Sequence, residues 1–317
     1  MTRSTPLAIL EKARFFHEFA TLLNSGISVQ QSLSLVGKDF NLSFRQYLQK
    51  VSTEVASGQD LASALALESR YFDGWTISLI RLAEYSGSLP QIFTQLANDA
   101  EAQARREKLY RSLNLSAIAI IWSLLILTAV IFNRSPLGFI RPEFWLRSLA
   151  VGLLLFGISF FVSRFLRRSA QLLLKNLPLV GKILSSHSMI YLAKLQLPLS
   201  CGVPILAAVD LVRSHIPDSV MRANLASAAK KIRAGETLSN SLQGKLLPIA
   251  LEMIRTGEET GNLDAAFHNL AQYYEGELER KLKVLEGRLR LLSILAIGAL
   301  VATVGIRGIN LLLNSLP

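Results

Sequence analysis

The side chains that most often carry catalysis or bind metals are few and scattered in this chain. Histidine stands at four positions and cysteine at one: His17, His187, His215, His268 and Cys201. No two of them have a spacing typical of metal ligands, and Cys201 has no nearby histidine or basic cluster to make it a nucleophile. We therefore expect no catalytic residue, no metal site and no enzyme activity.

Nucleotide chemistry is also not expected. A phosphate-cradling loop of the G-x-x-x-x-G-K-[ST] type does not occur in the sequence. The chain cannot be a P-loop motor of its own, and we expect it to carry no cofactor.

Two short polar turns stand out instead. They read AEYSGSL over 83–89 and GEETGNL over 257–263, each with a glutamate three residues before a glycine. One interpretation is a helix–turn–helix joint in which the Ser86 or Thr260 hydroxyl binds free backbone amides and the glycine supplies a positive φ. The other is an exposed acidic loop that docks a partner protein. The two interpretations are compatible.

The turns belong to a longer internal repeat. Three blocks recur in the same order, with Gly26 matching Gly202, Gly58 matching Gly235, and Gly87 matching Gly261. The nearly constant separation of 176, 177 and 174 residues makes chance improbable. The sequence thus predicts a duplication.

Each copy has the pattern of a helical bundle. Phe15, Phe16 and Phe19 recur on one helix face, and Gly26 follows where a left-handed cap would end that helix. Asp60 and Thr237 are placed to cap short helices. Long charged helices, roughly 90–111 and 264–290, should continue into apolar segments, and Pro198 should interrupt the helix whose counterpart in the first copy is intact.

Three apolar segments are long enough, with their flanks, to cross a hydrocarbon layer of roughly 30 Å. We predict an all-α membrane protein with two duplicated cytoplasmic helical bundles and three transmembrane helices. The predicted boundaries are a first bundle over 1–111, spans over 112–133, 145–165 and 289–313, a short outside loop over 134–144, a second bundle over 166–288, and an outside tail over 314–317.

Charge predicts the orientation. Lysine and arginine flank the inner ends of the spans more heavily than the short loop, which favours a cytoplasmic N-terminus and an outside C-terminus. Anionic lipid headgroups account for much of the net charge of +11. We expect contact with the bilayer and none with nucleic acid, because no basic stripe with interleaved aromatic residues is present.

Two other functions remain open from the residues alone. A small oligomeric transporter or channel would need polar residues in its spans, which offer only serine, threonine and Trp122 and no acidic residue. A membrane-anchored scaffold would use the two bundles to bind unrelated partners.

The ordered motifs of the two copies carry a resemblance. A helix ending in LLNSG or LSCGVP is followed by SGQ or AGE, and then by the turn AEYSGSL or GEETGNL. The C-terminal stretch reads GEETGNLDAAFHNLAQYYEGELERKL. Nearly the whole chain resembles the type II secretion system F protein and type IV pilus platform family.

This resemblance implies a platform protein of the bacterial inner membrane, which couples a cytoplasmic secretion or pilus assembly ATPase to the assembly of pilin or pseudopilin subunits. Other inner-membrane machine components and further copies of the chain would be partners. The residues that match the family's turns, and that we predict to face a partner, are Glu84, Ser86, Gly87, Glu258, Glu259, Thr260 and Gly261. Secretion, pilus assembly and DNA uptake all remain open.

Overall fold

The computed structural model describes residues 7–132 and 178–315, and these residues form helices and turns without a strand. The chain divides into two compact units, one made of 1–106 with 185–277 and the other of 107–184 with 278–317. The all-helical prediction is confirmed for the part that the structure describes. The predicted second span, 145–165, and the outside loop, 134–144, lie outside the described residues.

The first unit begins with a bundle built around aromatic side chains. Its helices are α1 (Ile9–Asn24), α2 (Val29–Val36), the 3₁₀ turn η1 (Gly37–Asp39), α3 (Leu42–Ala56), α4 (Leu61–Leu65), α5 (Gly74–Ser86) and the start of α6 (Leu89–Phe132). The buried Phe15 packs edge-on against Phe44, with ring centroids 5.4 Å apart, and Phe19 lies 4.6 Å from Phe93. The predicted apolar face of α1 therefore forms the core of this bundle.

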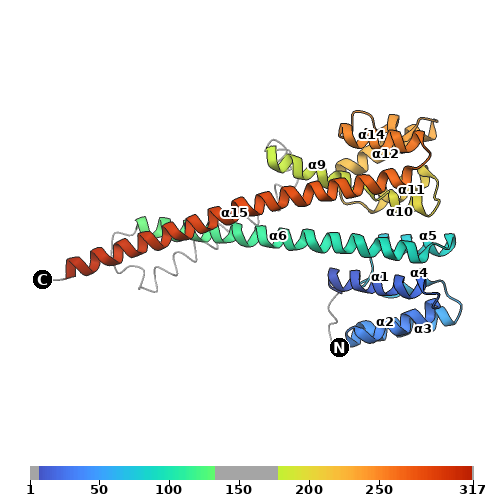
Figure 1. Ribbon diagram of the computed structural model, residues 1–317, viewed down its shortest axis with the longest axis horizontal. Helices are drawn as coiled ribbons and strands as arrows, with labels where there is room; N and C mark the ends of the chain where they lie inside the picture. The colour runs from blue at the N-terminus through green and yellow to red at the C-terminus, as the bar shows by residue number, and fades with distance from the viewer. Residues whose placement is uncertain (1–6, 133–177, 316–317) are drawn as a thin grey trace. The chain divides into compact units, whose positions relative to one another are not determined.

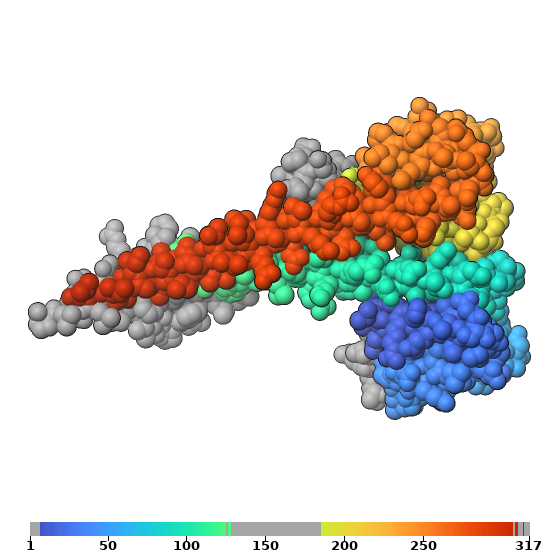
Figure 2. All heavy atoms as spheres, viewed as in Figure 1, coloured from blue at the N-terminus to red at the C-terminus, as the bar shows by residue number. Residues whose placement is uncertain are grey.

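A second set of helices completes the same unit. These are α9 (Pro178–Ala193), α10 (Gln196–Ser200), α11 (Ile205–His215), α12 (Ser219–Arg233), α13 (Leu238–Leu242), α14 (Pro248–Glu259) and the start of α15 (Leu263–Ser315). Their core is mostly aliphatic, with Leu225, Leu242 and Ile254 fully buried. In Figure 2 the cyan strip of α5 and α6 lies between the blue helices of the first set and the yellow and orange helices of the second.

The predicted helix ends are confirmed where local signals set them. Gly26 has φ 79° at the end of α1, as the left-handed cap requires. The side chains of Asp60 and Thr237 accept hydrogen bonds from the Ser63 and Asn240 amides, and so cap α4 and α13.

The interruption at Pro198 is also confirmed. Proline has no N–H with which to bind the carbonyl four residues earlier, and that carbonyl, of Lys194, instead accepts from the Leu197 amide at 3.3 Å. The helix breaks at Lys194 and Leu195, between α9 and α10 and about one turn before Pro198, whereas α1 is continuous.

Two long helices, α6 and α15, continue past their bundles without a break (Figure 1). Of the described residues, one helix is long and apolar enough to cross a membrane, Leu263–Ile306, and 6% of its most apolar stretch is buried within the protein. The predicted third span, 289–313, lies within α15 and shares residues 289–306 with this stretch. The predicted first span is helical as far as Phe132, inside α6.

Candidate functional site

The two predicted polar turns have the same backbone geometry. After α5 the Ser88 amide donates to the Ala83 carbonyl at 2.9 Å, and after α14 the Asn262 amide donates to the Gly257 carbonyl at 2.8 Å. Gly87 and Gly261 have φ of 71° and 70°, a left-handed conformation that a residue with a Cβ rarely adopts. The predicted helix–turn–helix joint is confirmed at both places.

The carboxylates of these turns point into the fold. Glu84 accepts from the amides of Leu61 and Ala62, at 2.7 and 3.2 Å, although it lies more than twenty residues away along the chain. Glu258 accepts in the same way from the amides of Leu238 and Ser239, the latter at 2.9 Å. Each glutamate thereby ties the start of a short helix, α4 or α13, to the helix that precedes the turn.

This contact completes the caps of the two short helices. The first amides of a helix have no partner within it. In α4, Glu84 binds the amides of Leu61 and Ala62 while Asp60 binds the amide of Ser63. A carboxylate at a helix N-terminus also interacts favourably with the positive end of the helix dipole. The sequence indicated the local cap but not the distant glutamate.

The turn residues that remain available to a partner are the exposed ones. Ser86, Gly87, Glu259, Thr260 and Gly261 are exposed, whereas Glu84 and Glu258 are half-buried and hydrogen-bonded within the fold. The expected role of the two hydroxyls is wrong. Ser86 donates to the Ala83 carbonyl and Thr260 to the Thr256 carbonyl, so these hydroxyls serve the preceding turn of helix instead of free amides.

Tyr85 is a surface residue that the sequence analysis missed. Its side chain is 84% exposed, which is unusual for a large aromatic residue, and it stands where the second turn has Glu259. An exposed aromatic side chain in a polar turn is typical of protein interfaces. The signal is present in the letters AEYSG, where a large aromatic residue stands between a glutamate and a serine–glycine pair.

The second turn also depends on a close approach of two helices. A Cβ on Gly257 would lie 2.5 Å from the Cβ of Ala266 in α15. Glycine is thus required where α14 meets α15. The first bundle has the buried Ala83 at the matching position and tolerates its methyl group.

Beside this turn is an open groove of about 530 Å³ between α14 and α15. Ile249, Met253 and Ala266 contribute its apolar surface, while Glu252, Thr256 and Asn269 are polar and exposed. No motif predicted it, since it arises from the sizes of side chains on two helices.

A charged crevice lies between α6, the end of α9 and α15. Arg106 pairs with Glu275 at 3.1 Å, and the two side chains are 17% and 28% exposed. Asp99 and Lys194 line the same crevice. The Asp99 side chain keeps some surface exposed to water, although its carboxylate lies among the protein atoms that line the crevice. Desolvation, followed by repulsion from Glu275, raises the pKa of Asp99 to about 6, and desolvation lowers the pKa of Lys194.

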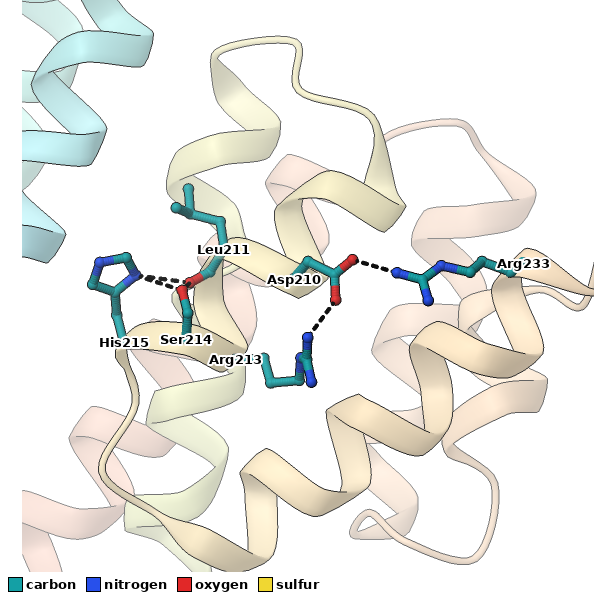
Figure 3. A network of polar contacts seen from close by, with 6 residues as sticks. All are labelled: Asp210, Leu211, Arg213, Ser214, His215 and Arg233. Carbon is teal, nitrogen blue, oxygen red and sulfur yellow. Dashed lines mark hydrogen bonds and ion pairs between the residues drawn. The ribbon is translucent and has the colours of Figure 1, made fainter.

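A network of polar contacts is centred on α11 in the second set of helices (Figure 3). Asp210 pairs with Arg233 at 2.8 Å and with Arg213 at 3.1 Å. At the end of α11 the His215 Nδ1 lies 2.9 Å from both the Ser214 hydroxyl and the Leu211 carbonyl, and the His215 ring lies 5.7 Å from the Trp75 ring of α5. Exposed ion pairs contribute only about 0–1 kcal/mol to the free energy of folding. We therefore interpret this network as one that orients α11 and adds little to stability.

Metal chemistry has no support in the described parts of the chain, where no three histidine, cysteine, aspartate or glutamate side chains are grouped to hold an ion. Cys201 is half-buried, and its sulfur lies 3.6 Å from the Ser88 hydroxyl across the contact between the two helix sets.

The chain is similar to proteins of one known family along most of its length. The model of the family "Type II secretion system (T2SS), protein F" matches residues 15–133 and again 191–306. The type IV pilus assembly protein PilC of Pseudomonas aeruginosa is 24% identical over 92% of this chain and 86% of its own length. PilC of Thermus thermophilus is 27% identical over 92% and 79%. The type II secretion system protein F of P. aeruginosa is 23% identical over 96% and 82%.

The relatives are named as components of pilus assembly and protein secretion, and the predicted family is confirmed. Because the family model covers most of the chain in two successive matches, the protein belongs to the type II secretion system protein F family, whose members are inner-membrane components of secretion and pilus machines.

Proposed function

We propose that the protein is the inner-membrane platform of a type II secretion or type IV pilus assembly machine and couples a cytoplasmic ATPase to the assembly of pilin or pseudopilin subunits. The observation that carries the proposal is the double match to the protein F family over most of the chain. On this proposal the chain is not an enzyme itself.

The proposed topology has three membrane spans, over 112–133, 145–165 and 289–313. The bundles over 1–111 and 166–288 are duplicated and cytoplasmic, the N-terminus is cytoplasmic and the C-terminus lies outside. Support for the duplication comes from the matching turns and from the equivalent contacts of Glu84 and Glu258. Support for the link between bundle and membrane comes from α15, which runs unbroken from the second turn through the apolar stretch.

We place the partner surface on the exposed residues of the two turns. Tyr85, Ser86 and Gly87 form the first part, and Glu259, Thr260 and Gly261 the second. Glu84 and Glu258 support these loops from within. Neither carboxylate is free to bind a partner while it holds the amides of a short helix, so their contribution to docking is to fix the shape of the turn.

The test is capture of partners by the full-length protein in detergent. The wild-type chain should co-purify with the ATPase and the pilin encoded by the same organism's machine. Tyr85→Ala and Glu259→Lys should weaken ATPase capture, because they change exposed side chains without touching the core. Glu101→Lys is the control, since Glu101 is also an exposed acid on a helix but lies outside both turns and outside the α14–α15 groove.

If the folded, membrane-inserted wild-type chain captures neither the ATPase nor pilin, the platform function is wrong. If it captures both and the turn variants behave like the Glu101→Lys control, the function stands and the partner surface lies elsewhere.

A further inference from the structure

The open groove between α14 and α15 corresponds to a surface that is covered in the first bundle. With the residue separation of the two turns, Ile249 matches Trp75, Met253 matches Leu79, and Ala266 matches Ile92. Trp75, Leu79 and Ile92 are 6%, 0% and 1% exposed, whereas Ile249 is 51% exposed and the other two groove residues are half-buried. Among the described residues, this face is therefore covered in the first bundle and open in the second.

The cover on the first bundle is known from the contacts. It consists of the end of α9, α10 and the end of α11, with α10 in contact with α5. The Lys194 ammonium lies 5.3 Å from the centre of the Trp75 ring, His215 lies against the same ring, and the Cys201 sulfur approaches the Ser88 hydroxyl. The second bundle therefore supplies the surface that buries Trp75.

The first bundle has its own surface equivalent to this cover, and no described residue packs over the three positions compared here. The residues that match Leu197, Cys201 and His215 are Thr21, Ser25 and Asp39, at the ends of α1 and η1, and all three are exposed. Leu197 by contrast is 2% exposed. The unit therefore has two exposed surfaces that correspond to the two sides of its internal contact. One is the groove on α14, which matches the covered face of the first bundle, and the other is the end of α1, which matches the surface that covers it. In Figure 1, α10 lies beside α5, while α14 lies on the other side of the second set of helices.

We propose that the α14–α15 groove of one copy of this protein binds the end of α1, with the turn at Gly26, of a second copy. The contact repeats between molecules the packing that the chain already makes between its own two helix sets. It rests on the duplication given under the proposed function. The two surfaces are different, so the contact is head-to-tail and produces a ring if the rotation closes, or an open chain if it does not.

The composition of the two surfaces fits an association that can form and break. Thr21 and Ser25 replace the more apolar Leu197 and Cys201, and the groove has the polar Glu252 and Thr256 where the covered face has Ser78 and Leu82. Interfaces between separately folded proteins are more polar than a core, because each surface must also be stable in water. The smaller Ile249 and Ala266 leave the space that the incoming helix end occupies.

The internal contact supplies a distance for the test. Cys201 lies 3.6 Å from Ser88, and the residues that match them are Ser25 and Asn262. In a Cys201→Ser background, one full-length chain carries Ser25→Cys and one affinity tag, and a second carries Asn262→Cys and a different tag. Both are co-expressed, and isolated membranes are oxidised with copper phenanthroline. We expect a mixed disulfide dimer that contains both tags.

The matched control replaces Ser25→Cys by Ser57→Cys. Ser57 is also an exposed serine that directly precedes a left-handed glycine at a helix end, but it lies at the end of α3 and outside the proposed contact. It should give several-fold less mixed dimer. Thr256→Arg in the Asn262→Cys chain should reduce the yield with Ser25→Cys, because a bulky charge then fills the groove.

Mixed dimer at the level of the Ser57 control, in chains that insert and still capture the ATPase, overturns the inference and leaves the proposed function standing. Equal or stronger cross-linking of Ser25→Cys to itself also overturns it, since that product requires a symmetric contact. A strong mixed dimer in chains that capture neither ATPase nor pilin supports the inference and counts against the platform function.

Discussion

The hydrogen bonds of Glu258 predict a large local effect from a single side chain. The perturbation is Glu258→Ala, which removes both acceptors from the Leu238 and Ser239 amides at the start of α13. Hydrogen bonds to charged groups contribute about 1.5–3 kcal/mol each. Leu238 and Ser239 are buried but Glu258 is only half-buried, so water compensates for part of this loss. We therefore expect the opening free energy of α13 to fall by about 2–4 kcal/mol.

Glu258→Gln keeps one acceptor oxygen and loses the charge. We expect it to cost about half as much as the alanine variant, roughly 1–2 kcal/mol, because one neutral hydrogen bond remains. Glu252→Ala is the matched control on the same helix, with a side chain that is 66% exposed and a single ion pair to Arg255. Exposed substitutions of this kind usually change stability by less than about 0.5 kcal/mol.

Hydrogen exchange of the full-length protein in detergent measures this effect where it occurs. A loss of 2–4 kcal/mol corresponds to exchange about 30- to 1,000-fold faster at the amides of Leu238 and Ser239, at about 1.4 kcal/mol for each factor of ten. Amides in the middle of α12 should change little. If exchange of α13 in Glu258→Ala equals that in Glu252→Ala, the glutamate does not hold the short helix and the reasoning for both turns is wrong.

Three further predictions concern other parts of the molecule. Gly257→Ala should destabilise the second bundle by about 1–3 kcal/mol through the clash with Ala266. The added methyl group of Gly276→Ala meets nothing within 4 Å, so this variant should stabilise α15 by about 0.5–1 kcal/mol, and thermal unfolding compares the two. Because the pKa of Asp99 is raised to about 6, folding favours its protonated form, and the free energy of unfolding should fall as pH rises from about 4 to 6. Melting curves of Asp99→Asn should show a weaker dependence on pH in this range. Leu295→Arg in the exposed apolar part of α15 should cost about 3 kcal/mol of membrane insertion and Leu295→Ile almost nothing, as carbonate extraction of membranes would measure.

Residues that act on their own neighbours were predicted well from the sequence. Gly26 ends α1, Asp60 and Thr237 cap α4 and α13, and Pro198 breaks the helix, because each effect depends on a few adjacent backbone groups. The family was also predicted, since its motifs are ordered along the chain.

Residues that act across the fold were not predicted. The sequence near Glu84 contains a carboxylate and a glycine, but nothing there indicates that the first amides of α4 lie within hydrogen-bonding distance. Arg106 and Glu275 are separated by 169 positions and pair only because α6 and α15 lie close together in the first unit. The groove depends on differences in size between repeats, such as Trp75 against Ile249, which a comparison of the two copies could have found.

The unbroken course of α15 constrains how its sequence can change in length. Each residue of an α-helix turns the chain by about 100° and advances it by about 1.5 Å. One extra residue between Phe267, whose side chain is fully buried in the second bundle, and Glu275, which pairs with Arg106, would rotate one of these contacts about a quarter of a turn away from its partner. Insertions or deletions here should be tolerated only in steps close to whole turns, such as seven or eleven residues, about two or three turns.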